Sequence, residues 1–328
     1  MMDPHNVILG GWNHPDNLGN HWLLVWVADQ LSHGKSILHN DMYYLPVGDA
    51  PWLAGNGSEG FWFIPFYMMF GWPLGAGIMT CLIHTLITYA GYRLSCNLGI
   101  HTWSSIVAGC TIASSTFIFR ELNAGRITQA NILFLLLALG SFAALLRTPN
   151  RSHIISTGIW SSLCAIGYWY YGFFFLIASI IMLLSWWVTH KKIPYRAILF
   201  ASLISITLAA PFLWFFMQSW SEIPGTIEEV FPSVQAQKDG LSWIPPWQFF
   251  MGREIGMTQP LILLGIVLFS IPYWKKLNRT TSYPMIVGSS WGLLFLWLSM
   301  GPEGGLYNLV YGIHKALQRF WWPSRHIV

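Results

Sequence analysis

Carboxylates gather near the start of this chain, ahead of its long apolar segments. They are Asp16, Asp29, Asp41, Asp49 and Glu59. A carboxylate can accept a proton as a general base or bind a divalent cation such as Mg²⁺ or Mn²⁺. We therefore take Asp16, Asp41 and Asp49 as candidate catalytic residues. The sequence contains no recognisable set of metal ligands and indicates no certain cofactor. A divalent cation bound by these carboxylates is the alternative to a general base.

Asp16 is the preferred candidate because of the segment that follows it. Residues 21–31 alternate apolar and polar side chains in a pattern that indicates an amphipathic helix lying on a membrane surface. Asp16 precedes this segment, near the expected helix N-terminus, where the helix dipole favours a carboxylate. The alternative is that Asp16 only caps the helix and that the other acids are solvated loop residues.

A second polar group lies between two apolar segments and contains Arg120, Glu121, Arg126 and Gln129. The planar guanidinium group of arginine matches the geometry of phosphate oxygens. We therefore expect the two arginines to hold a phosphate or diphosphate at the membrane interface, with Glu121 and Gln129 in the same binding site. The alternative is a simple Arg120–Glu121 ion pair whose long side chain reaches the interface.

Two further groups could bind the same kind of ligand. The aromatic residues 168–171, with Tyr170 at their centre, could stack on a sugar ring or a lipid head group, or could belong to an ordinary aromatic belt. Arg319 and Arg325 near the C-terminus suit an anionic head group, or form a basic stretch beside the membrane.

The elements that position these residues are membrane helices. The chain has 328 residues, of which 54% are hydrophobic and 9% charged, whereas soluble domains carry about 25% charged residues. A membrane span needs about 20 apolar residues. We predict an all-α integral membrane protein with about eight transmembrane helices, at residues 74–93, 102–119, 128–146, 154–168, 171–189, 197–217, 260–274 and 284–300. Residues 61–70 are apolar but short, and we expect Pro65 to break them, which predicts an interfacial or re-entrant segment.

The basic residues predict the orientation of these helices. They cluster at residues 93, 147–151, 191–196 and 275–279, which fall in alternate connections. The positive-inside rule places all four clusters in the cytoplasm. Every Asp and Glu then lies on the other side, so the chain is expected in the cytoplasmic (inner) membrane with acidic loops on the outer, periplasmic face.

This topology divides the chain into four parts. We expect an outer-face N-terminal loop at 1–73, carrying the amphipathic and re-entrant helices, and transmembrane helices 1–6 at 74–217. An outer loop at 218–259 and a last part at 260–328, with helices 7–8 and an outer C-terminal segment, complete the chain. A polar N-terminal stretch on the outer face is either exported unaided or follows a transmembrane helix missing from a fragment, and a fragment is the explanation we expect.

Several classes of function find no support. No Walker A, GxSxG, HExxH or GxGxxG pattern occurs in a suitable context, and the modest net charge of +4 requires no nucleic-acid partner. The four cysteines include no CxxC pair, so they indicate small membrane residues and not a metal site.

The order of the motifs resembles one family. P-D-x-x-x-N-x-W-x-L-x-W-x-A starts at Pro15, and D-x-x-x-x-P-x-G spans 41–48. G-R-I-x-Q then spans 125–129, Y-Y-G spans 170–172, and R-x-x-W-P-S-R spans 319–325. This order is similar to that of bacterial GT-C-type polytopic membrane glycosyltransferase-like proteins, whose relatives use polyprenyl-phosphate sugars.

The resemblance implies a catalytic acid in the first outer loop, which Asp16 matches best and Asp41 and Asp49 less well. In those relatives a transmembrane helix precedes this loop, so the resemblance implies either that the helix before Asp16 is missing from a fragment or that Asp16 is not the catalytic acid. The resemblance also implies transfer of a sugar from a lipid-linked donor to a glycan, lipid or protein acceptor. The alternative class is a membrane transporter, flippase or non-enzymatic assembly protein. Ionisable residues at one membrane surface and the lack of an internal repeat favour surface chemistry over transport.

Overall fold

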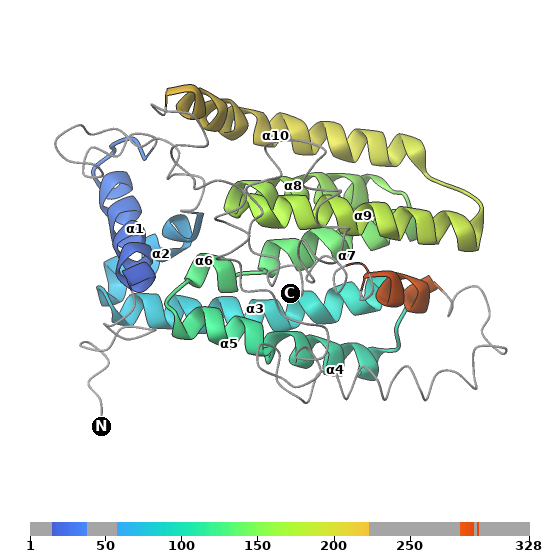
Figure 1. Cartoon of the computed structure of the whole chain (residues 1–328), viewed down its shortest axis with the longest axis horizontal. Coiled ribbons are helices and arrows are strands. Elements are labelled where there is room, and N and C mark those ends of the chain that lie inside the picture. Colours follow the sequence, from blue (N-terminus) through green and yellow to red (C-terminus); the bar gives the residue numbers. More distant parts are fainter. Residues whose placement is uncertain (1–14, 38–57, 223–282, 292–293, 295–328) are drawn as a thin grey trace, which may run out of the picture. The chain divides into compact units, whose positions relative to one another are not determined.

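The computed structural model describes residues 15–37, 58–222, 283–291 and 294, and within these ranges every regular element is an α-helix (Figure 1). The helices are α1 (Pro15–Ser32), α2 (Ser58–Phe70), α3 (Leu74–Leu98), α4 (Thr102–Ala113), α5 (Thr116–Asn123), α6 (Ile127–Ala130), α7 (Leu133–Arg147), α8 (Arg151–Gly167), α9 (Trp169–His190) and α10 (Tyr195–Glu222). Residues 283–291 are also helical. The chain divides into two compact units, and the first holds residues 1–187 and 191–222.

The predicted all-helical membrane class agrees with these elements. In the described part of the chain, five helical stretches are long and apolar enough to cross a membrane, at 74–98, 102–123, 127–147, 169–190 and 195–214. Helix α8 matches the predicted span at 154–168, although its 17 residues are shorter than those of the other five. The predicted span at 260–274 and most of that at 284–300 lie outside the described residues, so the number eight stays a prediction.

Two predicted spans are interrupted by polar side chains that bond to the backbone. The stretch predicted as one helix at 102–119 breaks at Ser114–Ser115, where the Ser115 hydroxyl accepts the N–H of Ile118 at 3.4 Å and starts α5. The stretch predicted at 128–146 breaks after α6, where the Asn131 side-chain oxygen accepts the N–H of Leu133 at 3.3 Å. Ser and Asn favour such helix starts because their side chains replace a missing backbone partner.

The N-terminal helices are longer than predicted and pack on each other. Helix α1 covers the amphipathic segment predicted at 21–31 and begins at Pro15, a residue favoured in the first turn of a helix. Helix α2 covers the predicted re-entrant segment but continues through Pro65, so the expected break there is wrong. A Cβ atom added at Gly60 of α2 would lie 2.5 Å from Val27 of α1, so these two helices are in close contact.

Successive long helices of the first unit run in opposite directions (Figure 1). The basic clusters therefore lie at one end of these helices. Arg147 at the end of α7 donates to the carbonyls of Cys96 and Asn97 at the end of α3, so these two helix ends lie together. The clusters at 93, 147–151 and 191–196 lie in or beside the connections at this end, which we call the basic end. The fourth predicted cluster, 275–279, lies outside the described residues. Which side of a membrane the basic end faces stays a prediction.

Glycines let α3 and α4 approach closely. A Cβ atom on Gly109 of α4 would lie 2.4 Å from the carbonyl oxygen of Thr88 and 2.9 Å from the backbone nitrogen of Tyr92, both on α3. Small residues at helix contacts are the usual means by which membrane helices associate. The α3–α4 pair therefore depends on the absence of a side chain at position 109.

We expect Gly109→Ala to destabilise the protein by about 1–3 kcal/mol, because the added methyl group meets backbone atoms that cannot rotate away. The matched control is Gly77→Ala on α3, where the same methyl group would find nothing within 4 Å. The measurement is the thermal unfolding midpoint of each purified variant in detergent. Equal midpoints for the two variants would contradict the packing described here.

Candidate functional site

The site is built on a sharp reversal between α5 and α7, which we call the polar elbow (residues 120–131). Helix α5 ends at Asn123, and Gly125 two residues later has a φ of 68°, the left-handed conformation that glycine adopts without strain. The N–H of Gly125 donates to Leu122 at 2.9 Å, and the N–H of Arg126 donates to Glu121 at 2.8 Å. This pair of bonds is the Schellman motif, which closes a helix end and redirects the chain. It brings Arg126 back beside Glu121.

Glu121 holds both arginines of the elbow. Its side chain is 1% exposed, and its two oxygens face Arg126 Nε at 2.5 Å and Arg120 Nη2 at 3.2 Å. The guanidinium of Arg120 also lies 5.6 Å from the ring centre of Phe117. Burying a carboxylate is costly unless opposite charges and hydrogen bonds compensate it. The ion pair that the sequence left as an alternative is thus present, and Arg126 takes part in it as well.

Glu59 joins the elbow from a distant part of the sequence. It is the second residue of α2, is 3% exposed, and accepts hydrogen bonds from Asn131 Nδ2 at 2.8 Å and Thr128 Oγ1 at 3.1 Å. Asn131 in turn accepts the N–H of Leu133, which fixes its amide with the nitrogen toward Glu59. From the sequence, Glu59 is one of the acids expected on the outer face but not one of the candidate site residues. A carboxylate directly before an apolar run, with Thr and Asn bordering another, was the available signal.

The charges at the elbow balance. Glu121 contacts both Arg120 and Arg126, and a second buried carboxylate, Glu59, binds Thr128 and Asn131 of the elbow. A phosphate group would therefore share the two guanidinium groups with Glu121, and would not meet an isolated cationic pair. The arrangement can orient the arginines for an anion, since a buried carboxylate holds them in fixed directions.

The predicted aromatic residues pack behind α6. The Tyr171 hydroxyl donates a short hydrogen bond to the backbone carbonyl of Gln129, and the Gln129 side-chain oxygen is buried with no partner among the described residues. Tyr168, Tyr170 and Tyr171 are 4–8% exposed, and the Tyr170 ring lies against Tyr168 and Trp169 at centroid distances of 5.1 and 4.2 Å. Buried rings that cover one another favour a supporting role over stacking on a sugar.

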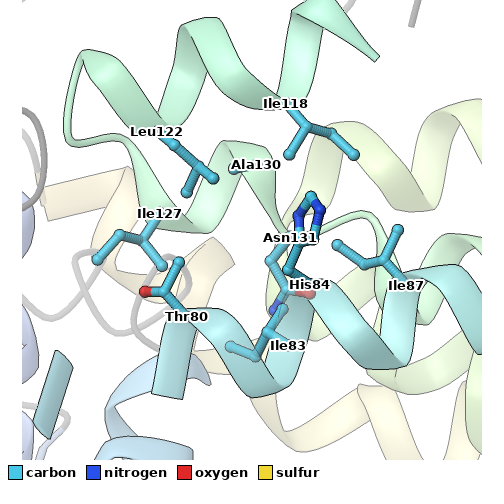
Figure 2. A pocket seen from close by; sticks show the side chains of 9 residues that line it. All are labelled: Thr80, Ile83, His84, Ile87, Ile118, Leu122, Ile127, Ala130 and Asn131. Atoms are coloured by element: carbon cyan, nitrogen blue, oxygen red, sulfur yellow. The ribbon is translucent and has the colours of Figure 1, made fainter. Parts of the chain in front are cut away.

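A small pocket lies beside the elbow between α3, α5 and α6 (Figure 2). Its walls are mainly isoleucine and leucine, and His84 of α3 extends into it toward Ile118. The His84 ring centre lies 5.6 Å from that of Phe119. The pocket has room for only about one water molecule, so it borders the elbow with an apolar wall and is not itself a ligand cavity.

The remaining predicted residues are placed in part or not at all. Asp16 is the second residue of α1, as expected for a carboxylate at a helix N-terminus, but its side chain lies outside the described residues. Asp41, Asp49, Arg319 and Arg325 also lie outside them. Within the part of the chain that the structure describes, no group of three or more His, Cys, Asp or Glu could hold a metal ion.

Fold and site together define an all-helical protein with several helices able to span a membrane and a buried polar elbow at one end. No protein-family model, curated protein or solved structure matches the chain.

Proposed function

We propose that this protein is a membrane glycosyltransferase that moves a sugar from a lipid-linked polyprenyl-phosphate donor to an acceptor on the outer face of the cytoplasmic membrane. The observation that carries the proposal is the polar elbow, where Glu121 orients Arg120 and Arg126 beside an apolar pocket. A lipid phosphate has the matching parts, an anionic head for guanidinium groups and a hydrocarbon chain for an apolar surface.

The location of the elbow supports surface chemistry. Helices α5 and α6, which carry the elbow, lie at the end of the first unit opposite the basic end (Figure 1), and Glu59 is bound to Thr128 of α6. If the basic end faces the cytoplasm, as the positive-inside rule predicts, the elbow faces outward. A lipid-linked donor reaches such a site by lateral diffusion, which removes any need for a nucleotide-binding site.

The reaction is a substitution at the first carbon of the sugar. Asp16 takes the proton of an acceptor hydroxyl, and the acceptor oxygen forms a bond to the sugar carbon. The bond from that carbon to the phosphate oxygen breaks, and polyprenyl phosphate leaves with the electron pair. Arg120 and Arg126 stabilise the negative charge that develops on the phosphate, a task Arg319 and Arg325 are also suited to.

The test is transfer of label by the purified protein in proteoliposomes. The donors are radiolabelled polyprenyl-phosphate mannose and glucose, and the acceptor is a detergent extract of bacterial envelope. We expect label to pass from the lipid fraction into the acceptor at a rate that depends on the amount of protein. Retention of all label on the lipid with every donor would contradict the proposal.

A transporter or flippase is the second candidate, and one observation favours it. Two of the five apolar stretches are interrupted, at Ser114–Ser115 and after Asn131, and discontinuous helices are frequent in transporters. The same proteoliposomes distinguish the two functions. A transporter would move a labelled lipid or solute across the membrane without forming a labelled acceptor.

A further inference from the structure

Glu59 occupies a position that no part of the reaction above uses. Its side chain is buried and joins α2 to residues 69 and 72 positions later in the chain. A carboxylate so far inside an apolar protein is costly, and such residues in membrane helices are mostly functional. A 3% exposed side chain cannot contact a substrate directly, so any role must act through the residues it holds.

We propose that Glu59 is a positioning residue, which attaches the N-terminal helices to the polar elbow and so sets the distance between Asp16 and Arg120 and Arg126. This inference rests on the proposed function. It concerns a residue outside the candidate catalytic and binding sets.

The attachment runs through rigid elements. Glu59 is bound at α6 and its C-terminal border by Thr128 and Asn131. The next residue, Gly60, packs against Val27 of α1 closely enough that a Cβ atom would lie 2.5 Å away. Asp16 lies on the same α-helix as Val27. A helix rises about 1.5 Å per residue and bends little over such a length, so moving Glu59 moves Asp16.

Both side-chain oxygens of Glu59 accept a hydrogen bond, so both must be acceptors for the two bonds to form. Asn131 can offer only its amide nitrogen, because its oxygen accepts from Leu133. Thr128 supplies the second donor. In Glu59→Gln an amide nitrogen would face one of these donors, so one bond is lost or reversed. The double exchange Glu59→Gln with Asn131→Asp restores a matched pair, because the new amide donates to the new carboxylate.

The double exchange keeps the hydrogen bond between positions 59 and 131 but removes the charge at position 59. It therefore distinguishes a positioning role of Glu59 from a direct need for its charge. We expect Glu59→Gln to lower kcat about 10- to 100-fold, since small displacements of reacting groups cost factors of this size. The donor KM should stay within about twofold, because Arg120 and Arg126 keep their partner Glu121. The double variant should recover kcat to within about threefold of wild type. Thr128→Val, which removes one donor at similar volume, should fall between wild type and Glu59→Gln.

The assay is donor-concentration-dependent transfer in the proteoliposomes described above, with polyprenyl-phosphate mannose and glucose as donors. Wild-type kcat in both Glu59→Gln and Thr128→Val would overturn the inference and leave the proposed function intact. A double variant no more active than Glu59→Gln would also overturn it, because the charge at position 59 would then be needed. If wild type itself transfers no label, the proposed function fails and the inference with it. If Glu59→Gln does not fold, Thr128→Val and the double exchange decide the question.

Discussion

Replacing Asp16 by asparagine is expected to lower sugar transfer about 10²- to 10⁴-fold, the usual contribution of a general base. Asparagine has nearly the same size as aspartate but cannot accept the acceptor's proton. Asp16 is the second residue of α1, and asparagine also suits a helix start. The amount of protein in the membrane should therefore equal that of wild type, as measured by quantitative immunoblotting beside the transfer assay.

Helix α1 offers a matched control for this substitution. Asp29 lies on the same helix, has a side chain 48% exposed, and pairs at 3.4 Å with His33 one turn away. Exposed pairs of this kind contribute little, so Asp29→Asn should transfer sugar at the wild-type rate. Wild-type transfer by Asp16→Asn would rule out Asp16 as the base, and an equal loss in both variants would point to a general requirement for acid on α1.

Replacing Glu121 by alanine is expected to have the largest effect on stability. Two arginine side chains would lose a buried carboxylate that both contact. Removing one partner of a buried ion pair costs about 3–5 kcal/mol, because the remaining charge stays in a poorly hydrated position. The measurement is the thermal unfolding midpoint in detergent, with Asp29→Ala as the exposed control.

The two variants should differ clearly in their midpoints. Asp29→Ala should unfold at nearly the wild-type temperature, and Glu121→Ala well below it or not accumulate at all. A triple variant that also replaces Arg120 and Arg126 by methionine should recover part of the lost stability, because neither arginine is then left without its partner Glu121. Similar midpoints for Glu121→Ala and Asp29→Ala would contradict the described role of Glu121.

The course of the helices could be predicted from the sequence to a useful extent. Spans of apolar residues in a chain with 9% charged residues define membrane helices by length alone. The interruptions at Ser115 and Asn131 were not predicted, because each depends on one side chain bonding to a nearby N–H. The helical continuation through Pro65 was also missed, since proline disfavours helix interiors but does not always end a helix.

The grouping of the elbow residues could be predicted from the sequence in part. Arg120, Glu121 and Arg126 lie within seven positions of one another, so their proximity follows from the local sequence. Their direct pairing depends on the turn at Gly125, whose motif can be recognised only when the helix end is known. The bond from Glu59 to Asn131 joins residues 72 positions apart, and a single sequence does not indicate such a pairing.

The aromatic residues show where side-chain type was insufficient. Tyr170 stays a candidate for stacking on a sugar, and its ring is buried between Tyr168 and Trp169, which the residue types alone did not indicate. Whether an aromatic ring can bind a ligand or only packs in the interior depends on how exposed the ring is. That exposure depends on neighbouring side chains that only the folded chain brings together.

The most direct test of the central claim is the transfer assay with wild type and Asp16→Asn compared in the same proteoliposome preparation. The proposed function predicts protein-dependent passage of labelled sugar from polyprenyl phosphate to the envelope acceptor in wild type, and none above background in Asp16→Asn. Label that stays on the lipid in both, or that crosses the membrane unchanged on its lipid carrier, would contradict glycosyl transfer.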